Sequence, residues 1–323
     1  MLKILYNGNV NSINFNEKER LEMKKEKDIA YIPPRKRRFG DRCEGRRLRT
    51  LPPIYCVTPF IMEKRSDSQN YFSDSIDIDN AEALVRQLRE QGYKNIGLLH
   101  VLLAAYVRVI SQRPALNRFV SGQRIYARHS IDICMAVKKE LSLNAPDTMI
   151  KVRFKPEQTL TEIYEKFNSV VEANNNMESS SSFDGVAKGL TLLPRFVFRN
   201  TVRALNWLDY RGWLPKFLLN VSPFHGSMII TSMGSLGIRP VYHHIYDFGN
   251  LPVFISYGAK RTQLVYDADG NVTKKHYMDI KVVMDERICD GYYYASAFKM
   301  LKRILKNPEQ LLEKPEKIIE DID

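Results

Sequence analysis

Met284-Asp285-Glu286-Arg287-Ile288-Cys289-Asp290-Gly291 is the stretch of sequence that decides the fold. Apolar and polar residues alternate before it, which predicts a strand whose apolar side carries Met278, Ile280, Val282 and Met284. Apolar residues recur at helical spacing after it, at Tyr294, Phe298, Leu301 and Leu305. The stretch therefore predicts a turn from a strand into a helix that Asp290 caps. Such turns lie at sheet edges, where active sites are often built.

The pattern Asp285-x-Arg287-x-x-Asp290-Gly291 resembles the signature of the superfamily of chloramphenicol acetyltransferase and the 2-oxo acid dehydrogenase acyltransferases. In that family a histidine general base occupies the position of Glu286. The resemblance implies an α/β fold, a two-layer sandwich with a mixed β-sheet, and acyl transfer from coenzyme A. It also implies that Asp290 holds the turn, through the helix cap and an arginine partner. A homotrimer is implied as well, in which the histidine turn of one subunit meets a serine strand of its neighbour.

A second stretch, Met228–Gly237, resembles the family strand that carries this serine. By resemblance, Ser232 donates a hydrogen bond to the oxyanion of the tetrahedral intermediate, with Thr231 as the alternative, and Gly234 and Gly237 are candidates for binding coenzyme A. A hydroxyl beside glycines can approach a developing oxyanion closely. Met233 stands where the family has an asparagine. The alternative interpretation is a glycine-rich turn at the end of a buried strand.

Glu286 occupies the position at which the family has its general base. A base must deprotonate the acceptor thiol, whose ordinary pKa is ~8.5. An imidazole, with a pKa of ~6.5, suits this task, whereas a glutamate carboxylate, with a pKa of ~4.3, is a much weaker base for it. Glu286 is therefore expected to need burial to act as a base. His243 and His244 lie in a segment that, by resemblance, runs along the active-site channel, so one of them is the alternative base. Neighbours on a strand point to opposite faces, so only one of the pair is expected to enter a shared pocket.

Arginines between residues 113 and 128 are candidates for binding the phosphates of coenzyme A. The sequence leaves open whether Arg113 and Arg118 do so or are surface charges. His100 falls in a predicted core helix and is expected to be structural. Trp207 and Trp213 are interpreted as buried core aromatics, with a substrate pocket as the alternative. Ile54–Val57 is predicted to be a short strand, and Thr159 with Glu162 is predicted to form a capping box at the start of a helix.

Composition and charge restrict the domain organisation and the partners. The chain has 323 residues and a net charge of +12, and its first 50 residues hold 14 Lys and Arg against 7 Asp and Glu. We predict a basic arm over 1–45, one acyltransferase-like domain over 46–310 and a tail over 311–323. The basic run Arg35–Arg38 is interpreted as part of a solvated arm, with an anion site as the alternative. Nucleic acid is not an expected partner, because aromatic residues only flank the run.

Cysteine spacing and hydropathy argue against several further classes. The four cysteines have no CxxC spacing, which disfavours a zinc site and a disulfide framework and predicts free thiols. No apolar run reaches the length of a membrane span, so a cytoplasmic location without a membrane partner is expected. Lipoyl and subunit-binding modules are not expected on this chain. The sequence thus predicts an acyltransferase with acyl-CoA as substrate and a thiol or hydroxyl acceptor. The alternative is a non-catalytic trimeric scaffold or acyl-CoA-binding protein of the same fold.

Overall fold

The computed structural model describes residues 36–138, 147–176, 185, 189–266 and 270–323. The chain divides into two units, Met1–Lys36 and Arg37–Asp323, and the described secondary structure belongs to the second. The predicted arm, 1–45, lies outside the described residues as far as residue 35.

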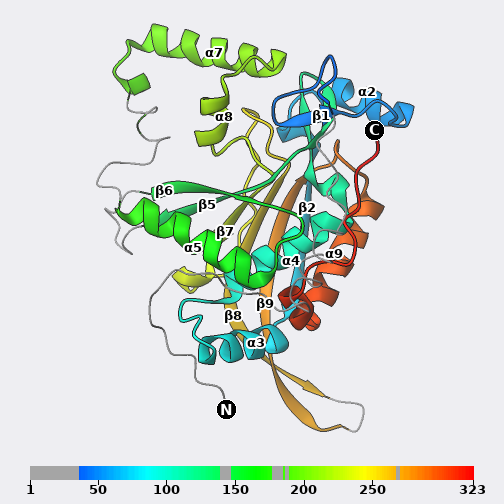
Figure 1. Ribbon diagram of the computed structural model, residues 1–323, viewed down its shortest axis with the longest axis vertical. Coiled ribbons are helices and arrows are strands. Elements are labelled where there is room, and N and C mark those ends of the chain that lie inside the picture. The colour runs from blue at the N-terminus through cyan, green and yellow to red at the C-terminus, as the bar shows by residue number, and fades with distance from the viewer. Residues whose placement is uncertain (1–35, 139–146, 177–184, 186–188, 267–269) are drawn as a thin grey trace, which may run out of the picture. The chain divides into compact units, whose positions relative to one another are not determined.

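A six-stranded mixed sheet forms the centre of this unit, with the strand order β2-β9-β8-β7-β5-β6 (Figure 1). The strands are β2 (Gln69–Asp77), β5 (Ile131–Lys138), β6 (Asp147–Phe154), β7 (Met228–Ser232), β8 (Val253–Tyr266) and β9 (Val272–Asp285). Strand β7 pairs in parallel with β5 and β8, and the other neighbours are antiparallel. The predicted strand ending in Met284 is thus β9, which pairs with β2 and β8.

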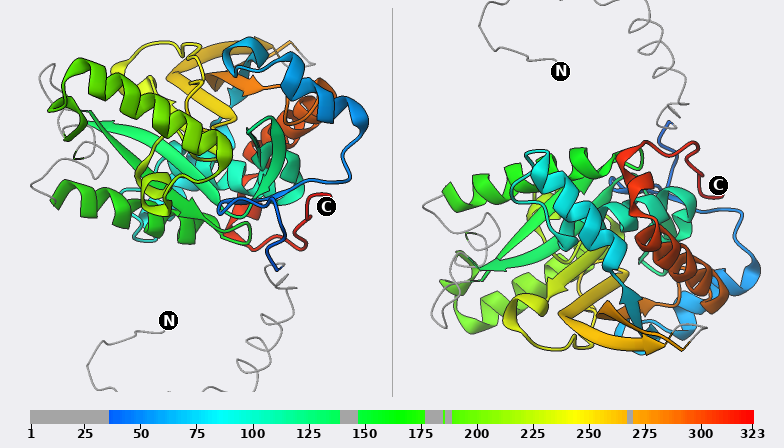
Figure 2. Two further views of the ribbon diagram at one scale, coloured as in Figure 1. Left: turned by 90° about the horizontal axis from the view of Figure 1, so that it is seen from above. Right: turned by 90° about the horizontal axis from the view of Figure 1, so that it is seen from below.

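Helices cover one face of this sheet and build the main core (Figures 1 and 2). They are α3 (Asp79–Glu90), α4 (Leu98–Gln112), α5 (Leu160–Asn176) and α9 (Gly291–Lys306). Helix α4 buries nearly all its side chains, as expected for a helix that is apolar on most sides. Helix α5 begins with the predicted capping box, in which the Thr159 and Glu162 side chains each accept a hydrogen bond from the other's backbone N–H.

The alternation of β9 explains how the two faces of the sheet differ. Met278, Ile280, Val282 and Met284 are buried in the core under the helices, as predicted. Val283 points to the opposite face, where it joins a smaller buried cluster with Phe254 and Leu251. The second face is therefore covered by a chain segment without regular structure instead of by a helix layer.

A three-stranded sheet, ordered β1-β4-β3, lies beside the turn that follows β9. It comprises β1 (Gly45–Arg47), β3 (Arg118–Ser121) and β4 (Arg124–Arg128). The C-terminal residues pack against the body: the Ile319 N–H donates to Ser111 O, and Asp323 O accepts from the N–H groups of Arg49 and Thr50. The remaining helices are α2 (Pro53–Ile61), α7 (Arg195–Arg211), α8 (Lys216–Val221) and the short 3₁₀ helices η1 (Ser66–Ser68), η2 (Pro114–Asn117), η3 (Gly234–Leu236) and η4 (Pro308–Leu312).

Two local predictions are wrong. Ile54–Val57 lies in helix α2, which Pro53 begins, because the fixed φ of proline suits a first helical turn. Trp207 and Trp213 do not lie in the core, since they are 50% and 61% exposed. By contrast, His100 is buried as expected: its Nδ1 accepts from the Gly97 N–H, and its Nε2 lies 3.3 Å from Asn168 Oδ1.

Deleting residues 1–36 is expected to leave the thermal midpoint within about 2 °C of that of the full chain, because the division of the chain falls after Lys36. Deleting residues 1–45 is expected to lower it by more, since Arg42 is buried and donates to Tyr210 O at 2.6 Å. Differential scanning calorimetry of both deletions measures this. A sharp loss in the shorter deletion would show that residues 1–36 stabilise the domain.

Candidate functional site

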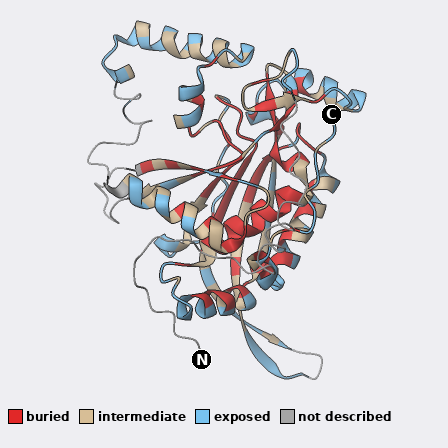
Figure 3. Cartoon of the chain, in the orientation of Figure 1, coloured by how far each residue is buried: buried red, intermediate tan, exposed pale blue. Residues whose placement is uncertain are grey.

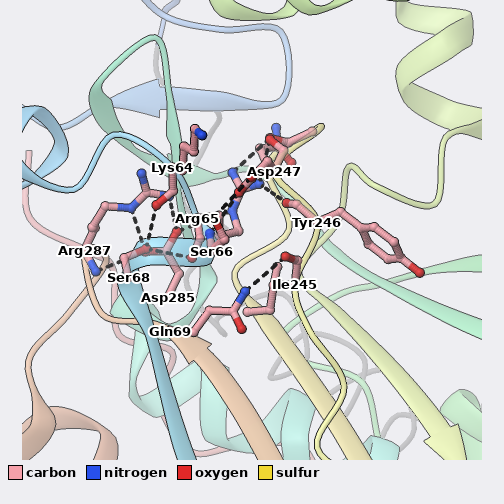
Figure 4. Close-up of polar contacts among 12 residues, drawn as sticks. Lys64, Arg65, Ser66, Ser68, Gln69, Ile245, Tyr246, Asp247, Asp285 and Arg287 are labelled. Atoms are coloured by element: carbon pink, nitrogen blue, oxygen red, sulfur yellow. Dashed lines mark hydrogen bonds and ion pairs between the residues drawn. The ribbon is translucent and has the colours of Figure 1, made fainter.

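Asp285, at the end of β9, is the buried centre of the turn (Figure 4). Its carboxylate accepts hydrogen bonds from Nε and Nη2 of Arg287 at 2.8 and 2.7 Å, and from Ser68 Oγ at 3.0 Å. Arg65 Nε forms an ion pair with the second oxygen at 3.4 Å. One buried aspartate therefore compensates the charges of two buried arginines. Burial lowers the pKa of Arg65, and the negative charge of Asp285 opposes that shift.

Arg65 also ties a distant segment to this turn. Its guanidinium donates to Tyr246 O at 2.6 Å and to Gly249 O at 2.9 Å. Beside it, the Ser66 N–H donates to Asp247 Oδ1 at 2.8 Å, as Figure 4 shows. The segment that carries the histidine pair is thus fixed to the same cluster as the 285–291 turn.

Glu286 follows Asp285 directly and its side chain is exposed. Its backbone N–H donates to Ser68 O at 2.9 Å, which holds the start of the turn against η1. Arg287 turns inward instead, and its Nη1 donates to Met62 O and Glu63 O, both at 3.0 Å, just after helix α2. The turn therefore presents the Glu286 carboxylate outward while its neighbours on both sides are buried.

Asp290 caps α9 as predicted, because its Oδ1 accepts from the Tyr293 N–H at 2.8 Å. The expected arginine partner is not the contact described. Oδ2 instead accepts from the Tyr55 hydroxyl at 3.0 Å, and Arg118 donates to the turn at Ile288 O. Burial raises the pKa of Cys289 to about 12, so this thiol stays protonated near neutral pH and is not a nucleophile.

Ser232 ends β7 and begins the second predicted site. Its Oγ accepts from the Ser235 N–H at 3.4 Å, and its side chain is hydrogen-bonded to buried Tyr257. Burial raises the pKa of Tyr257, and the bond to Ser232 opposes that shift. Both predicted glycines have a structural reason: a Cβ on Gly234 would lie 2.8 Å from Gly258 O, and Gly237 has a φ of +71°.

Ser232 and Glu286 lie at opposite ends of the sheet within one chain. Ser232 pairs with Tyr257 of β8, and Tyr257 pairs with Ile280 of β9. Glu286 lies six residues beyond Ile280, which at about 3.3 Å per residue places it about 20 Å along the strand direction. A single copy therefore does not bring the two predicted catalytic residues together.

His243 and His244 lie between these two ends, over the face of the sheet that the helices leave uncovered. The His243 ring stacks on Phe254 with a centroid distance of 4.2 Å and on His244 at 4.7 Å. Residues 240–246 form no strand, so the expectation of rings on opposite faces is wrong. Phe254 pairs with Val283, three residues before Glu286, so the pair lies about 10 Å along the strand direction from the turn.

Arg113 and Arg118, the predicted phosphate ligands, both make contacts inside the chain. Arg118 is buried; its Nε and Nη2 donate to both carboxylate oxygens of Asp321, and its Nη1 donates to Ile288 O at 3.1 Å. Arg113 is half-buried and donates to Ser296 Oγ at 3.1 Å and Gln112 O at 2.9 Å. Asp321 neutralises Arg118 directly, so Arg113 is the better placed of the two for an anionic ligand.

Residues 61–185 and 219–313 match the model of the family described as 2-oxoacid dehydrogenases acyltransferase (catalytic domain). These two ranges together span more than half of the chain. The chain belongs to this family. The two stretches that carry the resemblance, Met228–Gly237 and Asp285–Gly291, both lie within the second matched range. No curated protein sequence matches it significantly.

Solved structures of low sequence identity share its fold. A probable dihydrolipoamide acetyltransferase from Listeria monocytogenes 4b F2365 is 14% identical, with a TM-score of 0.50, over 80% of this chain and 95% of that chain. The cubic core of a pyruvate dehydrogenase multienzyme complex is 15% identical, with a TM-score of 0.51, over 88% and 100%. The predicted two-layer α/β sandwich with a mixed sheet is confirmed.

Among the described residues, no group of three or more His, Cys, Asp and Glu side chains is arranged to hold a metal ion. In the same part of the chain, no helix is both long and apolar enough to cross a bilayer.

Sequence analysis missed three residues that position the site: Arg65, Ser68 and Tyr257. Arg65 and Ser68 reach Asp285 from more than 200 positions earlier in the chain. Tyr257 meets Ser232 through the parallel pairing of β7 and β8. The basic and polar composition of Arg65–Ser68 was visible in the sequence, but only the strand register shows which carboxylate it faces.

Proposed function

We propose that the chain is a CoA-dependent acyltransferase whose reaction site forms between two copies, where Ser232 of one meets the Glu286 turn of the other. The observation that carries this proposal is that both family signatures are folded and ordered, yet lie about 20 Å apart in one chain. A second copy is the simplest way to bring them together.

In the proposed reaction, a base removes the proton from a thiol or hydroxyl acceptor, which attacks the acyl-CoA thioester carbon. The carbonyl oxygen becomes an oxyanion, and the Ser232 hydroxyl donates a hydrogen bond to it. The C–S bond then breaks, the acyl group stays on the acceptor, and the CoA thiolate takes the proton back from the base. No metal and no lipoyl group on this chain takes part, and the reaction is placed in the cytoplasm.

Glu286 is the proposed base, because the turn directs its carboxylate outward at the position of the family histidine. Its own chain does not bury it, so the second copy would have to exclude water from it. His243 or His244 is the alternative base. Arg113, with Gly234 and Gly237 at the Ser232 end, is proposed to bind acyl-CoA, and Arg118 to hold the turn through Ile288.

The assembly in this proposal is a homotrimer. Helix α2, which ends at the carbonyls that Arg287 binds, exposes large apolar side chains beside the Glu286 turn: Ile54, Val57, Phe60 and Ile61. An exposed apolar group of this kind is typical of a protein interface. A heterologous contact between α2 of one copy and the Ser232 end of the next closes a ring after three copies.

Mixing two inactive variants tests the shared site. Ser232→Ala and Glu286→Gln subunits, carrying different tags and purified through both, form trimers with one intact site of three, whichever variant predominates. Thiol release from a panel of acyl-CoAs is expected to reach about one third of the wild-type rate in these trimers and to be near zero in each variant alone. No recovery after mixing would show that the site does not form between copies.

Single variants also show which residue acts as the base. If Glu286→Gln keeps its activity and His243→Ala or His244→Ala loses it, the histidine pair holds the base. A second function, a non-catalytic scaffold or acyl-CoA-binding protein, is favoured by the exposure of Glu286. That function is supported if the wild type and Glu286→Gln both lack acyl transfer activity and only Glu286→His gains it.

A further inference from the structure

Residues 189–217, here the α7 segment, contain helix α7 and the start of α8 and lie within the gap between the two ranges that match the family model. None of the residues of α7 is buried, as Figure 3 shows. A helix of 17 residues that buries nothing in its own chain needs another reason to be kept.

The C-terminal end of α7 is nevertheless held firmly to the body. Asp209 O accepts from Ser121 Oγ at 3.3 Å, and its side chain lies 3.2 Å from Nε2 of buried His225. Tyr210 O accepts from buried Arg42, and the Tyr210 hydroxyl donates to Gln123 Oε1 at 2.6 Å. The helix therefore has a defined orientation, on the side of the sheet opposite to α5 (Figure 2).

Large apolar side chains are exposed along this segment: Leu192, Phe196, Trp207, Trp213 and Phe217. The two tryptophans are the only two of the chain. Their rings meet edge to face at 5.4 Å, so they form one continuous surface. Exposed aromatic groups of this size mark an interaction surface.

The same segment is strongly cationic. Arg195, Arg199 and Arg203 recur every four residues, which places them on one side of the helix, and all three are exposed. With Arg211 and Lys216, residues 189–217 carry five basic side chains against one acidic side chain, Asp209. The partner must therefore offer negative charge together with an apolar environment.

We propose that the α7 segment docks the protein onto the surface of an anionic lipid membrane. Lipid phosphates match the arginines, and the boundary with the acyl chains accepts tryptophan, phenylalanine and leucine. Nucleic acid supplies the charge but no apolar environment for Leu192 and Phe217. A second copy of this chain carries the same net charge of +12, which opposes docking of a cationic helix.

This partner differs from the sequence-based expectation of no membrane contact. That expectation rests on the length of apolar runs, which detects segments that cross a bilayer. A helix that lies on the membrane surface needs only exposed apolar side chains together with cationic ones. Docking would hold the acyltransferase at the membrane without inserting the chain.

Tryptophan fluorescence of the full chain tests the proposal, because both reporters lie in the α7 segment. Vesicles of phosphatidylglycerol and phosphatidylcholine in equal parts are expected to shift the emission to shorter wavelength and to sediment the protein. Vesicles of phosphatidylcholine alone are expected to do neither. Reversing Arg195, Arg199 and Arg203 to glutamate is expected to weaken binding about a hundredfold or more, since each basic residue near the surface contributes about 1 kcal/mol, which is about fivefold in affinity.

A matched control reverses three exposed basic residues of the helix layer: Arg86, Lys94 and Lys299. It changes the net charge equally and is expected to weaken binding much less. The proposal is overturned if the wild type does not bind anionic vesicles, or if the two triple variants weaken vesicle binding equally. It is also overturned if the α7 variant loses only self-association in light scattering or only RNA binding, because the occupant is then a second copy or a nucleic acid.

Discussion

Replacing Ser232 with alanine is expected to lower the rate of acyl-CoA thiol release about 100- to 1,000-fold, the usual loss when one donor to an oxyanion is removed. The hydroxyl lies at the end of β7, where Tyr257 and the Ser235 N–H fix its position. A donor held in this way does not have to reorganise as charge develops on the carbonyl oxygen. Steady-state kinetics with saturating acyl-CoA measure the loss, which should fall on kcat.

Ser235→Ala is the matched control, because Ser235 is an exposed serine of the same turn whose hydroxyl donates to Ser232 O at 3.0 Å. It removes one hydroxyl nearby and should change kcat by less than about threefold. Equal losses in the two variants would mean that the turn has been disturbed, and full activity in Ser232→Ala would remove Ser232 from the oxyanion role.

The local parts of the fold were predictable because their signals are local. The alternation before Met284, the cap at Asp290 and the box at Thr159 and Glu162 each depend on residues a few positions apart. The structure gives each of them the predicted contact. The two signatures likewise located the ends of β7 and β9 on which Ser232 and Glu286 sit.

The remaining features depend on contacts that spacing does not encode. Asp285 meets Arg65 because β2 pairs with β9, and the partner of Asp290 proved to be Tyr55, from helix α2. The stretch Ile54–Val57 was predicted as a strand, yet Pro53 begins a helix there. Trp207 and Trp213 were assigned to the core by residue type alone, which cannot show that helix α7 and the residues after it lie on the surface.

The buried Asp285 cluster is where the largest change of stability is expected. Asp285→Asn keeps the shape of the side chain but leaves Arg65 and Arg287 buried without their common counter-charge. Removing one partner from a buried ion pair costs about 3–5 kcal/mol. Urea unfolding followed by circular dichroism should show a loss of this size.

Asp279→Asn is the matched control for Asp285→Asn. Asp279 lies on the same strand and pairs with Arg261 at 3.1 Å, but this pair is partly exposed, with side chains 26% and 39% accessible. Such pairs contribute about 0–1 kcal/mol, because water screens both charges. The difference between the two variants therefore isolates the effect of burial.

Arg65→Met tests whether Arg65 and Asp285 are energetically coupled. With Asp285→Asn already present, it removes one of the two uncompensated charges, so the double variant should be more stable than the sum of the single losses predicts. It also releases Tyr246 and Gly249, so the histidine segment should lose part of its attachment to the turn. If the two losses simply add, Arg65 and Asp285 are not coupled, and the Asp285 carboxylate is compensated by Arg287 and Ser68.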